Sequence, residues 1–402
     1  MQIFSAVFAT LALALTSISA AAAADESLSG GLMRPLRVAT FNTSLNHNEA
    51  GGLIKQLSDD HLAARQVAAV IQRVRPDLVL LNEFDYDAEG RAAELFVTRY
   101  LGEGQFGERA ISYAHRFQAP VNTGVASGVD LTGDGKTDGP GDAWGFGMHP
   151  GQYGMLVLSR YPIDREQART FQQLRWGAMP GALVPLMPDK KTPWFSAETW
   201  AQLRLSSKSN WDLPVQTPLG TLHFLTAHPT PPVFDGPEDR NGHRNFDEIR
   251  LWAEYLSNTD TAWLCDDSGR CGGLSNDARF VIAGDYNADP LDGDSFPGAI
   301  AQLLEHPRVL PMAAPTSAGA AIAETADAAL AASKRTPAAQ HTGAFGPRVG
   351  NMRIDYVMPS LGYSVIRSGV FWPPADRPEA QWLQASDHRM VWVDLRLATE
   401  AN

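Results

Sequence analysis

Cysteine is nearly absent from the 402-residue sequence, which contains only Cys265 and Cys271. The spacing of these two residues fits neither the C-x-x-C pattern of a redox centre nor the usual spacing of zinc ligands. If the protein is exported, the pair predicts one small disulfide instead.

Charge is missing from the start of the sequence, where the first charged side chain is Asp25. An apolar stretch over residues 7–15 and the ending Ala22-Ala23-Ala24 predict a signal peptide over residues 1–24, although no Lys or Arg precedes the apolar stretch. The stretch is too short to cross a bilayer, and no later stretch is comparably apolar and uncharged. We therefore expect no transmembrane segment and a secreted or periplasmic protein.

Positive charge is scarce, because 33 Lys and Arg face 45 Asp and Glu, which gives a formal net charge of -12. Charge of this sign repels polyanions at long range. Tight nonspecific binding of nucleic acid is disfavoured, although a metal ion and a local basic patch would offset the repulsion. No feature of the sequence indicates an obligate protein partner.

Internal repeats and linkers rich in Pro, Ser or Gly are also missing. We expect one domain over residues 34–398 with three insertions, at about 118–152, 175–198 and 311–346. The first is rich in Gly and Asp, the second in Pro and Trp, and the third in Ala. Loops of this size usually select the substrate or decorate the surface.

Short aliphatic and β-branched runs, each closed by polar residues, Gly or Pro, predict strands. They lie at 36–41, 78–81, 155–158, 201–205, 221–226, 280–283, 354–358 and 390–395. Helical patterns occupy 61–74, 244–256 and 320–332. Strands and helices alternate only in part, so the predicted class is mixed α/β, with sheet covered by helices.

Polar side chains stand at the ends of these strands. Asn42, Glu83, His228, Asp285 and Asn287 each follow a strand, and Asp387 and His388 precede one. Ligand-binding groups of such sheets collect at strand ends, so these residues are expected at one edge. Clustered carboxylates require a compensating cation, and Mg²⁺ suits the oxygen atoms of Asn42, Glu83 and Asp387 better than zinc does.

Six segments in this order resemble the signature blocks of the endonuclease/exonuclease/phosphatase family, which includes deoxyribonuclease I, apurinic endonucleases, neutral sphingomyelinases and inositol polyphosphate phosphatases. They are Ala-Thr-Phe-Asn at 39–42, Leu-Asn-Glu at 81–83, Thr-Ala-His at 226–228, Ala-Gly-Asp-Tyr-Asn at 283–287, Arg-Ile-Asp-Tyr at 353–356 and Ser-Asp-His at 386–388. Each block alone is weak, but six in the family's order are specific. The resemblance implies a four-layer α/β sandwich: two mixed β-sheets packed face to face, helices outside, and a site in a cleft at one edge.

The resemblance also implies a role for each residue. Asn42, Glu83 and Asp387 would hold Mg²⁺ or Mn²⁺. Asp285 would orient or deprotonate the attacking water, and Asn287 would hold that water or the phosphate. His388 would face the scissile phosphate with its tautomer fixed by Asp355, and His228 would contact the phosphate or leaving group, as it does in the deoxyribonuclease and sphingomyelinase branches. Asn82 stands where the family more often has Gln, which predicts altered hydrogen bonding behind the metal site.

Two loops leave alternatives open. Arg240 and Arg244 would clamp an oxygen of the substrate, or else the charges of their proline-rich loop pair among themselves. Asp130, Thr132, Asp134 and Asp138 resemble a calcium loop, but Gly141 stands where its bidentate Glu is expected. This segment holds a structural Ca²⁺ or is an Asp/Gly turn.

The sequence thus predicts an exported, divalent-metal-dependent phosphoesterase that hydrolyses a phosphodiester or monoester by in-line attack of water. One alternative is an extracellular endonuclease acting on DNA or RNA. Another is a catalytically inactive, calcium-stabilised binding protein. The completeness of the polar set favours an enzyme over the binding protein.

Overall fold

The computed structural model describes residues 34–324 and 334–399. The predicted signal peptide and the end of the predicted Ala-rich helix, residues 325–332, lie outside this part. From Leu36 onward the chain forms one compact unit. Within the described ranges, no helix has the length and apolarity needed to span a bilayer.

Two sheets form the middle of this unit, in the orders β12-β13-β1-β2-β4-β3 and β11-β8-β7-β6-β5. Both are mixed, because β1 and β2 are parallel, β7 and β8 are parallel, and the other neighbours are antiparallel. The strands, with the separate ribbon of β9 and β10, are β1 (Leu36–Leu45), β2 (Leu78–Phe84), β3 (His115–Phe117), β4 (Met155–Ser159), β5 (Arg169–Thr170), β6 (Asn210–Thr217), β7 (Gly220–Ala227), β8 (Phe280–Asp285), β9 (Gly343–Ala344), β10 (Asn351–Met352), β11 (Asp355–Pro359), β12 (Tyr363–Val370) and β13 (Val391–Leu397).

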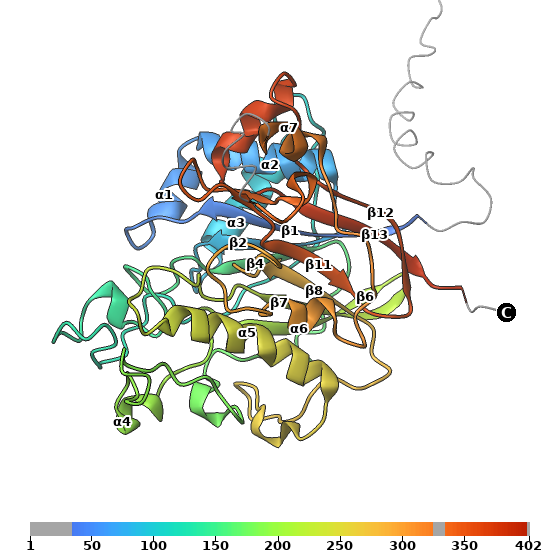
Figure 1. Cartoon of the computed structure of the whole chain (residues 1–402). Coiled ribbons are helices and arrows are strands. Elements are labelled where there is room, and N and C mark those ends of the chain that lie inside the picture. Colours follow the sequence, from blue (N-terminus) through green and yellow to red (C-terminus); the bar gives the residue numbers. More distant parts are fainter. Residues whose placement is uncertain (1–33, 325–333, 400–402) are drawn as a thin grey trace, which may run out of the picture. The chain divides into compact units, whose positions relative to one another are not determined.

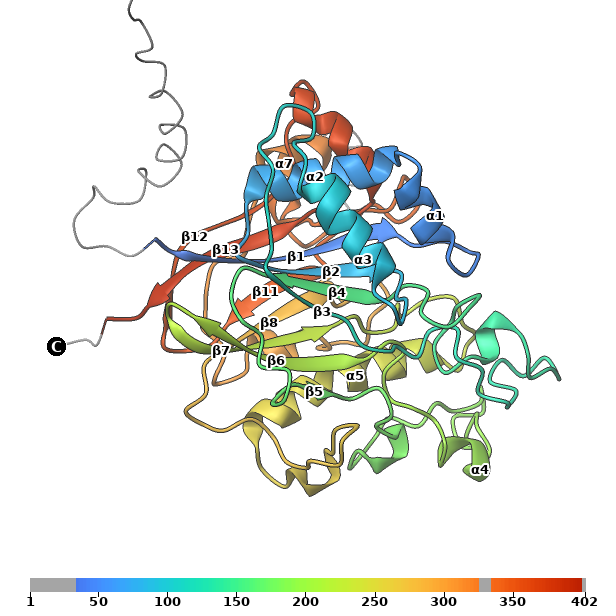
Figure 2. The same ribbon diagram turned by 180° about the vertical axis from the view of Figure 1, so that it is seen from behind.

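Helices cover the outer face of each sheet (Figures 1 and 2). The six-stranded sheet is covered by α1 (Gly52–Ser58), α2 (Leu62–Val74) and α3 (Arg91–Leu95), and the five-stranded sheet by α5 (Arg240–Ser257) and α6 (Ala301–Leu304). The remaining α-helices are α4 (Ala197–Trp200) and α7 (Ala318–Glu324). The predicted four-layer α/β sandwich is confirmed.

The central strands are buried on both faces. In β1, Val38 packs in the cluster between the sheets, whereas its neighbour Ala39 packs in the cluster beneath the helices. Leu80 and Leu81 of β2 divide in the same way. A strand with two buried faces needs apolar residues at every position, which is why these segments are continuous apolar runs in the sequence.

One strand prediction is wrong. Residues 201–205 follow α4 and form no strand; Arg204 makes only an isolated bridge with Arg175. The strand of this region is β6, which the sequence analysis missed because it contains Pro214. Pro214 lies beyond the residues of β6 that pair with β5, and its carbonyl oxygen accepts from the N–H of Asp164 at 2.8 Å.

The described residues of the three predicted insertions contain little regular structure, and the boundaries of the insertions remain predictions. The first connects β3 to β4, the second lies between β5 and β6, and the third includes α7 and β9. Cys265 and Cys271 form a disulfide, as expected. The carboxylate of Asp266 inside this loop accepts a hydrogen bond from Arg169 Nε at 2.8 Å.

The side chain of Asn82 joins the two sheets. Its Oδ1 accepts from the backbone N–H of Asp285 at 3.2 Å, and its Nδ2 donates to the carbonyl oxygen of Ala227 at 3.3 Å. Asn82 is fully buried, so neither partner has water as a replacement. Asn82 therefore bridges β2 to β7 and β8, and the altered hydrogen bonding expected of Asn in place of Gln stays a prediction.

We predict that Asn82→Ala lowers the free energy of unfolding by about 2–4 kcal/mol, because it leaves two buried backbone groups unpaired. Denaturant unfolding followed by fluorescence measures the change. The control is Asn276→Ala, an exposed position where the loss should be below about 0.5 kcal/mol. Equal values for the two variants would contradict the bridging role.

Candidate active site

The predicted site residues meet at one edge of the two sheets. β1, β2, β7 and β8 all end there, whereas β11 and β13 run antiparallel to their neighbours and begin there. In register, Asp355 at the start of β11 pairs with Asp285 at the end of β8. The topology therefore brings together residues separated by more than three hundred positions.

A bulge in β1 positions Glu83. Asn42 pairs with Asn82 and Leu45 with Phe84, so two residues of β1 lie opposite Glu83 alone. Glu83 has a φ of 54°, a left-handed conformation that non-glycine residues seldom adopt. Its Oε1 accepts from Asn42 Nδ2 at 3.1 Å and its Oε2 from Asn46 Nδ2 at 3.0 Å. Bulges and strained backbone of this kind occur near functional sites, where they redirect a side chain.

Asp285 lies at the centre of the site and is fully buried. Its Oδ2 accepts from Asn42 Nδ2 at 3.0 Å and lies 3.4 Å from His228 Nε2 and 3.6 Å from His388 Nε2. Burial acts to raise the pKa of Asp285, but the charge of His388 and the hydrogen bond with His228 outweigh it and lower the pKa. Asp285 therefore stays ionised.

Gly284 permits this arrangement. A Cβ atom at this position would lie 2.2 Å from the carbonyl oxygen of Ala227 on the neighbouring strand. Only glycine allows β7 and β8 to approach this closely next to Asp285.

His388 and Asp355 form a buried pair. His388 Nδ1 lies 3.0 Å from Asp355 Oδ2, and the same oxygen accepts from Thr342 Oγ1 at 2.8 Å. Burial acts to lower the pKa of His388, but the charges of Asp355 and Asp285 prevail and raise it to about 10. His388 thus carries a proton at neutral pH, and the placement expected for the pair is present.

His228 differs from His388 although both approach the same carboxylate. Burial and the charge of Lys208 lower the pKa of His228, which favours the neutral ring. Its Nδ1 is buried and has no hydrogen-bond partner among the described residues. Such an atom is rare in folded proteins unless a ligand or water completes it.

Asn287 and Asp387 complete the predicted set. Asn287 has a φ of 51°; its N–H donates to Asp285 Oδ1 at 2.9 Å, and its Nδ2 donates to the carbonyl oxygen of Pro229 at 3.1 Å. The side chain of Asp387 is 53% exposed, and its Oδ1 lies 3.9 Å from His388 Nε2. Asp387 is therefore the member of the set that faces solvent.

The donor atoms suit a divalent cation. Glu83, Asp285, Asp355 and Asp387 contribute four carboxylates, against which the nearby positive groups are His388, Lys208 and Arg389. A cation balances the remaining negative charge, and carboxylate and amide oxygens are the ligands that Mg²⁺ prefers. Asp285, Asp355 and His388 are also close enough to hold an ion, but both nitrogens of His388 already face carboxylates.

Two residues of this site, Lys208 and Asn46, were not predicted from the sequence. Lys208 is buried just before β6, and the charges of Glu248, Glu83 and Asp285 act on it; burial still lowers its pKa. Glu248 holds the loop of Lys208 against that of His228, because its two oxygens accept from the N–H groups of Ser207 and Thr230. Asn46 donates a hydrogen bond to Glu83. Neither Lys208 nor Asn46 belongs to a recognisable motif.

The two predicted substrate arginines are engaged by the protein itself. Arg240 pairs with Glu238 of its own loop. The guanidinium of Arg244 donates to the carbonyl oxygens of Leu205, Trp144 and Arg204 at 2.6–2.9 Å. The ion pair of Arg240 fits the alternative in which the charges of the loop pair among themselves, whereas Arg244 bonds to segments outside the loop and ties them together. A substrate role for either arginine remains a prediction.

The predicted calcium loop is held by hydrogen bonds of its own. The carboxylate of Asp130 accepts from the N–H groups of Gly133 and Gly135 at 2.6 and 2.8 Å. Asp142 is buried and accepts from the N–H of Leu131 at 3.0 Å. These are contacts of an Asp/Gly turn, and calcium binding here remains a prediction.

The family model described as Endonuclease/Exonuclease/phosphatase family matches residues 39–388, which include every residue of this edge. The chain belongs to the endonuclease/exonuclease/phosphatase family. Its members are metal-dependent phosphoesterases or nucleases, so the chain is assigned to hydrolases acting on phosphate esters. A search of curated proteins finds no match.

Solved structures with a similar fold come from several bacteria. An endonuclease/exonuclease/phosphatase from Beutenbergia cavernae is 20% identical over 91% of this chain and 72% of its own, with a TM-score of 0.48. A family protein from Leptotrichia buccalis is 13% identical over 90% and 100%, with a TM-score of 0.46. Sphingomyelinase C from Streptomyces griseocarneus is 15% identical over 90% and 99%, with a TM-score of 0.43.

We predict that Arg244→Ala lowers the free energy of unfolding by about 2–4 kcal/mol, because three buried carbonyl oxygens lose a charged donor. The comparison variant is Arg109→Ala, at an exposed position, for which the change should be below about 0.5 kcal/mol. Denaturant unfolding measures both. An Arg244→Ala protein of wild-type stability but with a strongly raised KM would favour the substrate-clamp role.

Proposed function

We propose that the protein is an exported phosphodiesterase that uses Mg²⁺ or Mn²⁺. The observation that carries this proposal is the position of Asp285, whose one carboxylate oxygen lies beside Asn42, His228 and His388. Export is supported by the predicted signal peptide and by the disulfide of Cys265 and Cys271.

Asn42, Glu83 and Asp387 would hold the metal ion. Bound there, it would polarise the phosphoryl oxygens and stabilise the charge that develops on the leaving group. Asn42 Nδ2 donates to the carboxylates of Glu83 and Asp285, which keeps the metal residues next to the residues proposed to position water. Its Oδ1, the atom that would bind the ion, accepts from the N–H of Ser44 at 3.2 Å.

Asp285 and Asn287 would position the attacking water. An ionised Asp285 accepts a hydrogen bond from the water and aligns its lone pair with phosphorus. Its lowered pKa makes it a weak base, so orientation is its main contribution. The bond from the N–H of Asn287 to Asp285 Oδ1 fixes the carboxylate in place.

The two histidines would play different parts. His388 carries a proton, which suits it to donate to a phosphoryl oxygen as negative charge grows there. Asp355 fixes its ring, with Nδ1 held and Nε2 turned towards Asp285. His228 is neutral and its Nε2–H faces Asp285, so its buried Nδ1, which has no partner among the described residues, is an acceptor and would contact a hydroxyl of the leaving group.

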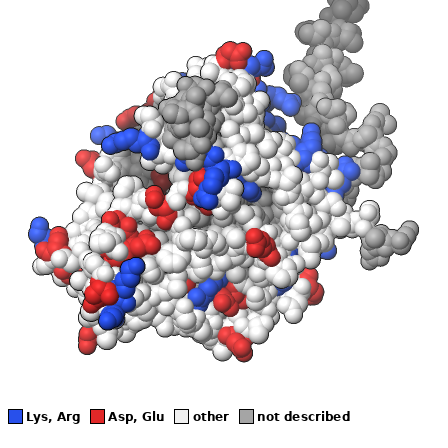
Figure 3. Space-filling view, viewed as in Figure 1, with Lys and Arg blue, Asp and Glu red and all other residues white. Residues whose placement is uncertain are grey.

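Charge favours a diester over a monoester and over nucleic acid. A phosphodiester has one negative charge, a monoester close to two at neutral pH, and the site already has four carboxylates. On the face in Figure 3, positive and negative side chains are interspersed, without a continuous track of Lys and Arg across its described part. Such a track is the usual footprint of a nucleic-acid surface.

We predict that the purified mature protein hydrolyses bis(4-nitrophenyl) phosphate faster than 4-nitrophenyl phosphate or plasmid DNA. EDTA should abolish turnover, and excess Mg²⁺ or Mn²⁺ should restore it. Release of nitrophenolate and gel electrophoresis of the plasmid measure the three activities. Turnover that survives EDTA would contradict metal dependence, and faster cleavage of DNA would favour the endonuclease.

We predict different defects for two site variants. His388→Asn should lower kcat by about 100-fold or more. Glu83→Gln should raise the metal concentration for half-maximal rate at least about tenfold. The controls are His115→Asn and Glu89→Gln, which lie outside the site and should retain wild-type values. Near-wild-type kinetics in both site variants would refute the proposed roles.

A further inference from the structure

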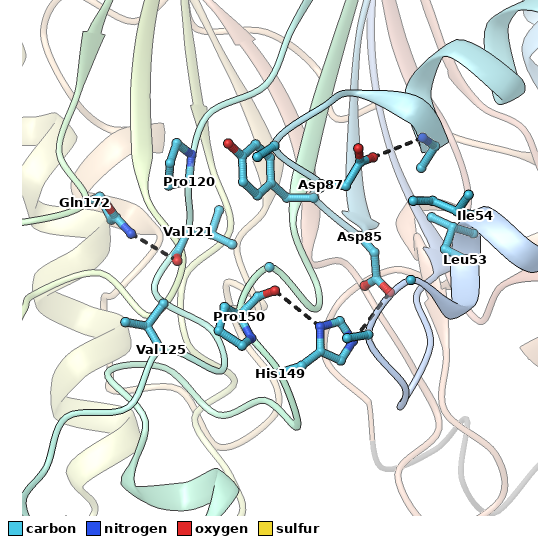
Figure 4. A pocket seen from close by; sticks show the side chains of 16 residues that line it. Leu53, Ile54, Asp85, Asp87, Pro120, Val121, Val125, His149, Pro150 and Gln172 are labelled. Carbon is cyan, nitrogen blue, oxygen red and sulfur yellow. Dashed lines mark hydrogen bonds and ion pairs between the residues drawn. The ribbon is translucent and has the colours of Figure 1, made fainter.

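A pocket of about 380 Å³ is lined by residues of α1 and of the segments that follow β2 and β3 (Figure 4). Leu53 and Ile54 of α1 lie on one side, and Val121 and Val125 on the other. The second side comes from the first predicted insertion, so the pocket is formed between α1 and that segment. Its volume is in the range of small-molecule binding sites.

The pocket adjoins the proposed metal ligands. Asp85 of its wall is two residues beyond Glu83, and its Oδ2 accepts from the N–H of His47 at 2.8 Å. The residue before His47 is Asn46, whose amide binds Glu83. A substrate whose phosphate reaches Glu83 therefore has the pocket within reach of one of its ester groups.

Gly151 brings the two halves of the pocket together. It has a φ of 93°, and a Cβ atom there would lie 2.5 Å from the carbonyl oxygen of Tyr86. The N–H of Tyr86 in turn donates to the carbonyl oxygen of Gly151 at 2.8 Å. The insertion is thus fastened directly to the chain that follows Glu83, which makes the pocket a built feature of the fold.

The pocket wall has two carboxylates, Asp85 and Asp87, and one imidazole, His149, whose Nε2 lies 4.0 Å from Asp85 Oδ2. Neither Lys nor Arg is among the described residues that line it, whereas Asp85 and Asp87 are. Asp87 is fixed by the N–H groups of Arg91 and Ala92, to which its oxygens bind at 2.8 and 3.0 Å. The remainder of the wall is mainly aliphatic, with Pro120 and Pro150.

We propose that this pocket binds an organic substituent of the phosphodiester and selects one that is apolar and has no negative charge. This inference rests on the proposed function. Aliphatic walls stabilise an apolar group by removing it from water. The two carboxylates disfavour a second anionic group, such as the next phosphate of a polynucleotide or a carboxylate on the substituent.

The first test fills the pocket. Ile54 is half-buried in the wall, whereas Lys55 is the next residue of α1 and is exposed. Ile54→Trp should lower kcat/KM for bis(4-nitrophenyl) phosphate at least about tenfold, because the larger ring occupies the space of the substituent. Lys55→Trp should stay within about twofold of wild type. Both ester groups of this substrate are identical, so the test holds whichever of them enters the pocket.

The second test removes one charge from the pocket wall. Asp87→Asn removes the charge and keeps one of the two hydrogen bonds to the N–H groups of Arg91 and Ala92, because Asn has a single acceptor oxygen. The measured quantity is the ratio of kcat/KM for bis(4-carboxyphenyl) phosphate to that for bis(4-nitrophenyl) phosphate. Asp87→Asn should raise this ratio about fivefold. Glu89→Gln removes an exposed charge nearby, outside the pocket, and should leave the ratio unchanged.

Different results would overturn the proposed function and the pocket assignment. A wild-type enzyme inert towards every ester with every metal overturns the proposed function itself. An active enzyme that tolerates Ile54→Trp, or whose ratio is unaffected by Asp87→Asn, overturns the pocket assignment alone. If Ile54→Trp does not fold, the ratio for Asp87→Asn decides the assignment.

Discussion

The carboxylate of Asp285 is the constraint on which the site depends. It is buried at the edge where the two sheets meet and is held from both, by Asn42 of the six-stranded sheet and by the N–H of Asn287 after β8. An isolated buried carboxylate is costly, so the surrounding amides and imidazoles must remain in place. Two protonation states follow: a charged His388 paired with Asp355, and a neutral His228.

Strained backbone at the same edge depends on the rigid layers behind it. Glu83 and Asn287 both adopt left-handed φ values, of 54° and 51°, at the ends of strands whose apolar residues are fully buried. Such conformations each cost about 1–3 kcal/mol and persist only where the surroundings fix them. The bulge in β1, the bridge from Asn82 and the close approach at Gly284 supply that fixation.

The features that could be predicted from the sequence are those with a local residue pattern. β1, β2, β7 and β8 are apolar on both faces, so their ends, and the motif residues after them, were found from the sequence. β6 was missed because it contains Pro214, which lies beyond the residues that pair with β5. Lys208, Arg244 and the pocket depend on contacts between distant loops, for which no periodicity or spacing exists. Arg244 in particular has the composition of a phosphate clamp and the contacts of a structural tie.

The central claim is that Asn42, Glu83 and Asp387 form a divalent-metal site. A crystal grown with Mn²⁺ and measured for anomalous scattering locates the ion without reference to any substrate. The account predicts one strong peak within about 2–2.5 Å of the Glu83 carboxylate, facing Asp387. A peak between Asp285, Asp355 and His388, or none at this edge of the sheets, would contradict it.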